Sequence, residues 1–273
     1  MRTFMKKINS ISIVVLITYL AMVIVNGLAN ALPINGMITG DISDSYPNLF
    51  APTGITFTIW GVIYLLLAAH TAYQLGLFRK QGEEVKNALL KEVGTLFAIS
   101  SLANVAWIFA WHYKNILLSL LFMLIILVCL ALIYIRIHKE QLTTTEKVFI
   151  RLPFSVYFGW IIVATIANVT TLLVDKLGSP VNLLGIPEVV WTVAILLVGL
   201  LIGVVTTLKH RDVAYGLGIV WAYIGILIKH LMDKPLPDGF NSQYPAVIVT
   251  VVISLVVLVA TIIFSQLKAK NTK

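Results

Sequence analysis

The sequence predicts an all-α, polytopic transmembrane helical bundle of eight spans, with both termini cytoplasmic. Three observations predict this fold class. The 273 residues are 59% apolar and 12% charged, about half the charged share of a typical soluble domain, and the mean hydropathy is +0.95. Eight segments are long and apolar enough to cross a bilayer. Lys and Arg gather in alternate connections between these segments.

Each predicted span holds about 20 mostly apolar residues, the length that a helix needs to cross the hydrocarbon core. In chain order the spans cover residues 9–31, 54–77, 93–112, 115–137, 150–174, 188–208, 213–231 and 245–267. None of them shows the period-two alternation that is typical of a barrel strand. The pattern therefore favours helices throughout.

The orientation of the bundle follows from the positions of its basic residues. The N-terminus and the connections after the second, fourth, sixth and eighth spans carry three, four, four, two and three Lys or Arg, 16 of the 20 in the chain. The opposite side carries only Lys114, Lys176, Lys229 and Lys234. Because cytoplasmic loops are enriched in Lys and Arg, the 16-residue side is predicted to be cytoplasmic.

The first span has a second interpretation. Lys6 and Lys7 precede its apolar stretch, which ends in Ala29-Asn30-Ala31, a sequence similar to a signal-peptidase site. Cleavage there would leave seven spans in the same orientation. The stretch is long for a signal peptide, so we expect it to remain as a span.

The loops predict two units, a five-helix bundle over residues 1–175 and a three-helix unit over residues 188–273. The segment 175–187, rich in Gly and Pro, separates them. The other long outer loop, residues 32–53, contains turn-forming residues and two acids, Asp41 and Asp44, which we expect to be solvated. Lys229, near the outer end of the seventh span, is predicted to extend its ammonium to the interface.

Four predicted helices carry aromatic and amide residues at spacings of three, four or seven, which places them on one helix face. These residues are Tyr19, Asn26 and Asn30; Phe57, Trp60 and Tyr64; Asn104, Trp107 and Trp111; and Pro153, Tyr157, Trp160, Ala164 and Asn168. Polar faces inside a bilayer turn toward other helices or a cavity. Packing or interfacial anchoring explains any one of these residues, Trp111 above all. Together they predict a cavity with aromatic walls that suits a flat, largely apolar ligand with a polar edge.

At these residues the sequence resembles the TspO/MBR family, the tryptophan-rich sensory proteins. The shared elements are Phe50-Ala51-Pro52 before Trp60-x-x-x-Tyr64, then Asn104-x-x-Trp107, then Pro153 followed by Trp160-x-x-x-Ala164-x-x-x-Asn168. The gaps from Pro52 to Trp60 and from Pro153 to Trp160 are longer than in the family. The resemblance covers residues 9–175, and the last three spans are additional to it.

The resemblance implies a five-helix membrane bundle that binds porphyrins, sterol-like compounds or other hydrophobic molecules among its helices. It implies that residues 32–53 cap the pocket and is compatible with a homodimer. The resemblance and the aromatic and amide helix faces together indicate the ligand-binding residues. These are Asn26, Asn30, Trp60, Tyr64, Asn104, Trp107, Trp111, Tyr157, Trp160, Ala164 and Asn168.

Several function classes lack support in the sequence. It has no Gly-rich phosphate loop, no HExxH motif and no paired carboxylates within the spans, so we expect no enzyme activity, no metal and no cofactor. The sequence also lacks a basic groove with interleaved aromatics, which would indicate nucleic-acid binding. The single cysteine, Cys129, is expected to be a buried hydrophobe. His70, inside the second span, is expected to be neutral and hydrogen-bonded to a neighbouring helix.

Three functions remain open at the level of the sequence. The favoured one is a cell-membrane receptor or carrier for a hydrophobic small molecule. The second is a secondary transporter or permease for a small neutral solute. The third is a structural or sensory subunit that acts through a partner, with the last three spans as its docking surface.

Overall fold

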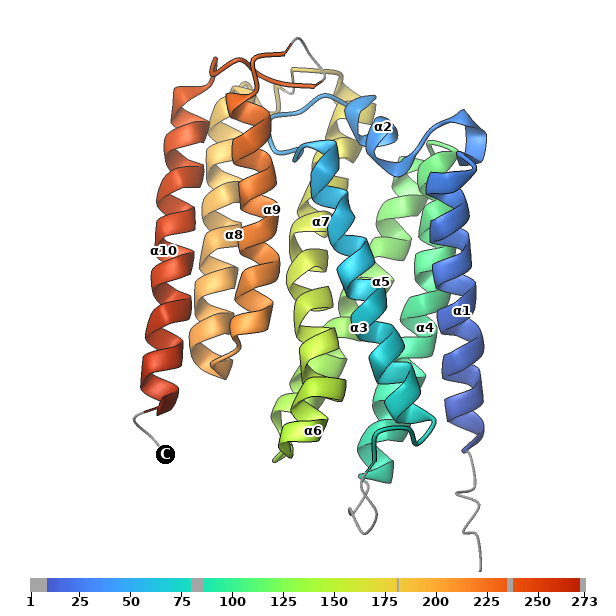
Figure 1. Cartoon of the computed structure of the whole chain (residues 1–273). Helices are drawn as coiled ribbons and strands as arrows, with labels where there is room; N and C mark the ends of the chain where they lie inside the picture. The colour runs from blue at the N-terminus through green and yellow to red at the C-terminus, as the bar shows by residue number, and fades with distance from the viewer. Residues whose placement is uncertain (1–8, 80–85, 181, 235–237, 271–273) are drawn as a thin grey trace, which may run out of the picture.

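The computed structural model describes residues 9–79, 86–180, 182–234 and 238–270 as a bundle of long helices that run side by side (Figure 1). Within these residues, eight helical segments are long and apolar enough to span a membrane, and no β-strand is formed. The prediction of an all-α, eight-span fold is therefore confirmed. The start of the first helix and the end of the last lie at the same end of the bundle. The basic residues Arg2, Lys6, Lys7, Lys80 and Lys273 lie outside the described residues.

Five helices form a closed ring. They are α1 (Ser10–Ala31), α3 (Ile59–Gln74), α4 (Asn87–His112), α5 (Ile116–His138) and α7 (Leu152–Leu177). Around the ring, α1 contacts α4, α4 contacts α5, α5 contacts α7, α7 contacts α3 and α3 returns to α1. The order in space thus differs from the order in sequence, and every helix has two neighbours with which to bury its polar face.

Three further helices pack beside this ring (Figure 1). They are α8 (Glu188–His210), α9 (Val213–Leu231) and α10 (Pro245–Lys270). Helix α9 lies along α7, while α10 packs against both α8 and α9. The three-helix unit therefore joins the ring chiefly through one helix pair, α7 and α9.

The connection between α1 and α3 folds over the end of the ring that lies opposite the start of α1. It contains η1 (Ile34–Gly36), α2 (Thr39–Asp44) and η2 (Gly54–Thr58). We call residues 32–58 the cap. At the opposite end, the short α6 (Thr144–Glu146) and a π-helical turn, η3 (Lys147–Arg151), run directly into α7.

Two spans begin earlier than the hydropathy predicts. Helix α4 starts at Asn87 rather than residue 93, and the α6–α7 segment starts at Thr144 rather than residue 150. Charged residues such as Lys91 and Glu92 lower the local hydropathy but do not break a helix. At the start of the α6–α7 segment, Thr143 and Glu146 form a reciprocal capping box that satisfies two backbone N–H groups.

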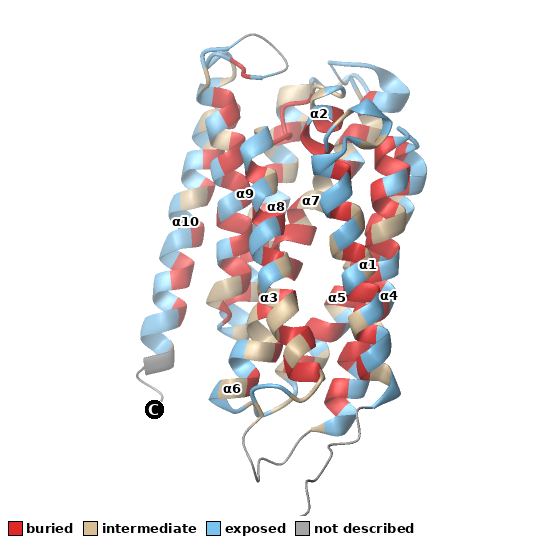
Figure 2. Cartoon of the chain, turned by 45° about the vertical axis from the view of Figure 1, so that its right-hand side comes forward, coloured by how far each residue is buried: buried red, intermediate tan, exposed pale blue. Residues whose placement is uncertain are grey.

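Burial follows the expectation for a protein in lipid (Figure 2). Buried residues face the interior of the bundle, and exposed residues cover the outer sides of helices such as α1 and α10. The exposed residues include large aliphatic side chains, for example Leu65, Leu201 and Val256, each more than 60% exposed. Such a surface is unfavourable in water and suits contact with acyl chains. The chain is a multi-pass integral membrane protein.

Candidate functional site

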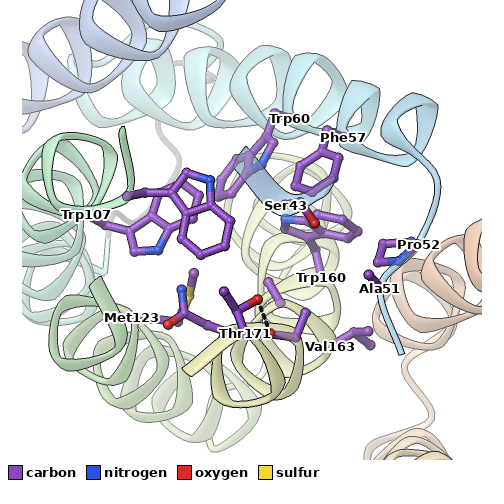
Figure 3. Close-up of a pocket in the computed structure, with 14 residues that line it drawn as sticks. Ser43, Ala51, Pro52, Phe57, Trp60, Trp107, Met123, Trp160, Val163 and Thr171 are labelled. Atoms are coloured by element: carbon purple, nitrogen blue, oxygen red, sulfur yellow. Dashed lines mark hydrogen bonds between the residues drawn. The ribbon is translucent and has the colours of Figure 1, made fainter. Parts of the chain in front are cut away.

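A cavity lies inside the ring near the end that the cap covers, directly beneath the cap (Figure 3). The cap contributes Ser43, Ala51, Pro52 and Phe57; α3, α4 and α5 contribute Trp60, Trp107, Trp111 and Met123; α7 contributes Trp160, Val163, Ala164, Ala167, Asn168 and Thr171. About 520 Å³ of space between these residues is not filled by atoms, and about 30 Å³ of it can receive a water-sized molecule. The side chains are thus close together, and a larger ligand must move some of them apart.

Trp60 is the centre of an aromatic cluster in the walls of this cavity. Its ring stacks on Tyr64, with centroids 5.5 Å apart and planes at 23°. Tyr157 and Trp160 meet it edge-on, at 5.7 and 6.2 Å, and Trp107 lies tilted at 6.2 Å. Aromatic pairs prefer such offset and edge-to-face arrangements. One indole from α3 therefore holds together residues of α4 and α7 that are far apart in sequence.

A second stack ties α4 to the cap. Trp111 lies against Trp107 at 5.8 Å with planes at 20°. The Trp111 indole N–H donates to the Thr39 carbonyl oxygen at 3.1 Å, and only 4% of the residue is exposed. Trp111 is therefore a buried cavity residue that positions the cap rather than only an anchor at the interface.

Two indole N–H groups at the cavity have no acceptor. Trp107 and Trp160 are 4% and 2% exposed, and among the described residues no hydrogen-bond partner is found for either Nε1. A buried donor without a partner costs about 1–3 kcal/mol. Both side chains line the same cavity (Figure 3), so one ligand with suitably placed acceptor atoms, or water, can satisfy both.

The amide residues connect neighbouring helices of the ring. The Asn26 side chain of α1 donates to the Asn104 side-chain oxygen of α4 at 2.6 Å. Asn168 of α7 donates to the Ser119 hydroxyl of α5 at 3.0 Å. These buried hydrogen bonds replace contacts that lipid cannot provide. Asn168 also lines the cavity, together with the polar side chains of Ser43 and Thr171.

The structure brings most of the predicted site residues together. Trp60, Trp107, Trp111, Trp160, Ala164 and Asn168 line the cavity. Tyr64 and Tyr157 contact the ring of Trp60, and Asn26 and Asn104 form the pair just described. Asn30 differs from its prediction, because it is exposed near the end of α1 and donates back to the Asn26 carbonyl at 2.9 Å.

Some lining residues were missed by the sequence analysis. Met123 and Val163 carry no polar or aromatic signal, since they resemble every other apolar residue of a span. Ser43 comes from the cap, whose position over the cavity depends on long-range contacts. The Phe50-Ala51-Pro52 motif was the available signal for the cap, and two of its residues line the cavity.

The last three spans hold the cap in place. The Lys229 ammonium of α9 pairs with the Asp44 carboxylate at 2.5 Å, and the Lys229 side chain is 2% exposed. His230 Nε2 donates to the Leu49 carbonyl at 2.8 Å, and the Leu49 N–H donates to the Glu188 carboxylate at 2.9 Å. The expectations that Lys229 extends to the interface and that Asp44 is solvated are wrong, because each satisfies the charge of the other.

The middle of α9 also contacts the cap closely. The Gly225 carbonyl accepts a hydrogen bond from the Thr53 N–H at 3.2 Å, and the Trp221 indole donates to the Thr56 carbonyl at 2.8 Å. A Cβ at Gly225 would overlap the Thr56 side chain. The three-helix unit thus determines where the cap lies over the cavity.

The described lining of the cavity is apolar and aromatic, with few polar side chains. Among the described residues, no group of three or more His, Cys, Asp or Glu side chains is placed to hold a metal ion. The described lining residues include no charged side chain. The arrangement suits apolar contact, stacking and a few hydrogen bonds.

No curated protein and no solved structure matches the chain significantly. The sequence profile of a family described as TSPO-like protein matches residues 12–264. The match extends beyond the motifs of α1–α7 and includes α8, α9 and most of α10, so the expectation that the last three spans are additional to the family is wrong. With the aromatic cavity inside a ring of five helices, this match over nearly the whole length shows that the chain belongs to the TSPO-like protein family.

Proposed function

We propose that this membrane protein binds a flat, largely apolar small molecule with hydrogen-bond acceptors, such as a porphyrin or a sterol-like compound, in the cavity beneath the cap. The observation that carries the proposal is the pair of buried, unpartnered indole N–H groups of Trp107 and Trp160 in an aromatic wall. A ligand that inserts there gains stacking and apolar contact and supplies the missing acceptors.

The proposed ligand must open the site as it binds. The space between the lining atoms is narrow, since about 30 Å³ of it can receive a water-sized molecule, well below the volume of typical small-molecule pockets. Little of it is free in this structure, so rotation of indoles or movement of the cap accompanies binding. The absence of charged side chains from the described lining favours binding, transfer or sensing of the ligand over its chemical conversion.

The test is a tetrapyrrole titration of the purified full-length protein, followed by quenching of tryptophan fluorescence. We expect saturable quenching by protoporphyrin IX. Trp160→Phe retains a ring but loses the N–H donor, so its affinity should fall by about three- to tenfold, the equivalent of one hydrogen bond. Trp191→Phe is the matched control, since the Trp191 indole donates to the Leu183 carbonyl away from the cavity.

Two results would contradict the proposal. One is the absence of saturable quenching by tetrapyrroles together with the absence of competition by sterol-like compounds. The other is unchanged affinity in Trp160→Phe while Trp191→Phe loses affinity. Mass spectrometry of small molecules that copurify with the protein would then identify what the cavity holds instead.

A further inference from the structure

A second cleft lies at the opposite end of the molecule, where α1 begins and α10 ends. It is lined by the end of α5, by η3 and by the end of α8. About 220 Å³ of it is open to water-sized molecules, far more than in the aromatic cavity. Its charged and titratable lining residues are His138, Glu140, Lys147, Arg151, Lys209 and His210. Nothing in the function proposed above uses these residues.

The acids of this region are already neutralised. Glu140 accepts a hydrogen bond from the Arg136 guanidinium at 2.6 Å and lies 3.5 Å from the Lys86 ammonium. Asp212, buried beneath the cleft, pairs with Arg151 at 3.3 Å and with His138 at 3.2 Å. Neither carboxylate is therefore free to compensate additional cations.

Two lysines of the cleft have no counter-charge among the described residues. Lys147 on η3 and Lys209 on α8 are both exposed, and no acceptor for either ammonium is found among the described residues. Lys147 and Lys209 are 62 positions apart in the sequence, and the fold places both around one cleft. Like charges that share a cleft repel each other, and a bound anion relieves that repulsion.

The Arg151 guanidinium, which lines the same cleft, is held in a defined orientation. Arg151 donates from Nη2 to the His210 carbonyl at 2.9 Å and from Nε to Asp212 at 3.3 Å. Asp212 also accepts from the Ser155 hydroxyl at 2.5 Å. The His138 and His210 rings lie 4.6 Å apart at the same wall. The cleft is thus a built site with an ordered floor, not a set of unrelated surface lysines.

Membrane orientation alone does not account for this arrangement. The positive-inside rule requires Lys and Arg on one side of the bilayer, but it does not require them to share a cavity. Exposed Lys91 and Lys139, at the same end of the bundle, line a different groove between α4 and α5. Two lysines without a counter-charge among the described residues, beside an oriented guanidinium and two imidazoles in one polar cleft, favour a ligand of opposite charge.

We propose that this cleft binds a phosphate group, carried either by a soluble compound or by the headgroup of an anionic lipid. Phosphate has the charge and the several acceptor oxygens that lysines and an oriented guanidinium recognise together. A position at the end of the bundle, level with the expected membrane surface, is accessible to both sources. The inference is independent of the ligand in the aromatic cavity.

The experiment uses the full-length protein in nanodiscs of neutral phosphatidylcholine. Pyrophosphate is titrated by calorimetry at constant ionic strength, and in a second arm phosphatidylglycerol is mixed into the disc and its retention is followed by native mass spectrometry. We expect saturable binding in at least one arm. Lys147→Gln/Lys209→Gln should weaken it by about tenfold or more, because two charge-assisted contacts are lost.

The matched control is Lys91→Gln/Lys139→Gln, which removes the same charge from the neighbouring groove. Because all four lysines are exposed, both variants are expected to fold, and equal melting temperatures verify this. Pyrophosphate binding identifies a soluble phosphate ligand, and selective phosphatidylglycerol retention identifies a lipid headgroup. Absence of binding in both arms, or equal losses in the two double variants, would overturn the proposal.

Discussion

Lys229 carries its charge inside the end of the bundle that the cap covers, where an unpaired ammonium is costly. Its partner Asp44 belongs to the cap, so the ion pair joins α9 to the segment that closes the cavity. Removal of one member of a buried pair leaves an uncompensated charge, whereas removal of both often costs little. This asymmetry makes the pair suitable for a double-mutant test.

We expect Asp44→Asn to destabilise the folded protein by about 3 kcal/mol, because it leaves the Lys229 ammonium buried without a counter-charge. Addition of Lys229→Met to the same chain should restore a large part of this loss. The measurement is thermal unfolding, in one detergent, of the wild type, Asp44→Asn, Lys229→Met and the double variant. If the effects of the two single variants simply add, the pair does not couple the cap to α9.

Asp212 is a second buried carboxylate, placed in the turn between α8 and α9. Burial opposes its ionisation, but hydrogen bonds from His138 and Ser155 and the charge of Arg151 outweigh burial and lower the pKa of Asp212 to about 2. Its ordinary value is 3.8. Because the folded-state pKa lies below the unfolded value, ionised Asp212 stabilises the folded state above about pH 4. That stabilisation is lost as the pH falls toward 2.

The corresponding prediction concerns acid stability. The difference in unfolding free energy between the wild type and Asp212→Asn should be on the order of 2 kcal/mol at neutral pH and should shrink between pH 4 and pH 2. Denaturation of both proteins across this range provides the measurement. A difference that stays constant down to pH 2 would show that Asp212 is not stabilised as an anion.

At the scale of the elements, the contact between α7 and α9 joins the five-helix ring to the last three helices. Gly159 of α7 faces the backbone carbonyl of Tyr215, and a Cβ at Gly218 of α9 would lie 3.0 Å from the carbonyl oxygen of Val156. Small residues on both helices let the backbones approach closely, as is usual in membrane bundles. His70 joins α3 to η3, since its Nδ1 donates to the Phe149 carbonyl at 2.9 Å; the expected hydrogen bond to a neighbouring segment is confirmed.

Gly159→Ala should separate α7 from α9, because the added methyl would overlap the Tyr215 carbonyl oxygen. We expect a loss of about 1–3 kcal/mol of stability, typical of overpacking. Gly27→Ala in α1 is the control, since its Cβ would meet no atom within 4 Å, and it should be neutral or slightly stabilising. Equal melting temperatures for the two variants would contradict close packing at the α7–α9 contact.

At the scale of the whole molecule, the two ends of the bundle differ in composition and in shape. One end carries the cap and the aromatic cavity beneath it, and the other carries the basic cleft. The excess of Lys and Arg predicts that the cleft faces the cytoplasm and that the cap faces the opposite compartment. The proposed hydrophobic ligand and the proposed phosphate would then approach from different sides of the membrane.

Cysteine labelling of intact cells tests this orientation. In a Cys129→Ser background, a cysteine introduced by Asp238→Cys in the α9–α10 connection should react with an impermeant maleimide added outside. A cysteine introduced by Lys139→Cys, at the end of α5, should react only after the membrane is permeabilised. Both positions are exposed at opposite ends of the bundle. The reverse pattern would place the termini outside.

The sequence by itself determined the number of spans, their approximate limits and the faces on which Trp60, Trp107 and Trp160 lie. Hydropathy and helical periodicity are local properties, so each can be read from about 20 consecutive residues. The family motifs added that these faces meet around one cavity. The starts of α4 and of the α6–α7 segment were predicted too late, because these helices extend beyond the apolar stretch into charged residues.

Only the tertiary structure decided which helices are neighbours, and several features depend on that. The Lys229–Asp44 pair joins residues 185 positions apart, and the basic cleft combines the ends of three helices. Met123 lines the cavity although nothing distinguishes it from the other apolar residues of its span. Ring order and cap position result from side chains that satisfy one another across the bundle. Such pairwise complementarity is absent from the local pattern of any single segment.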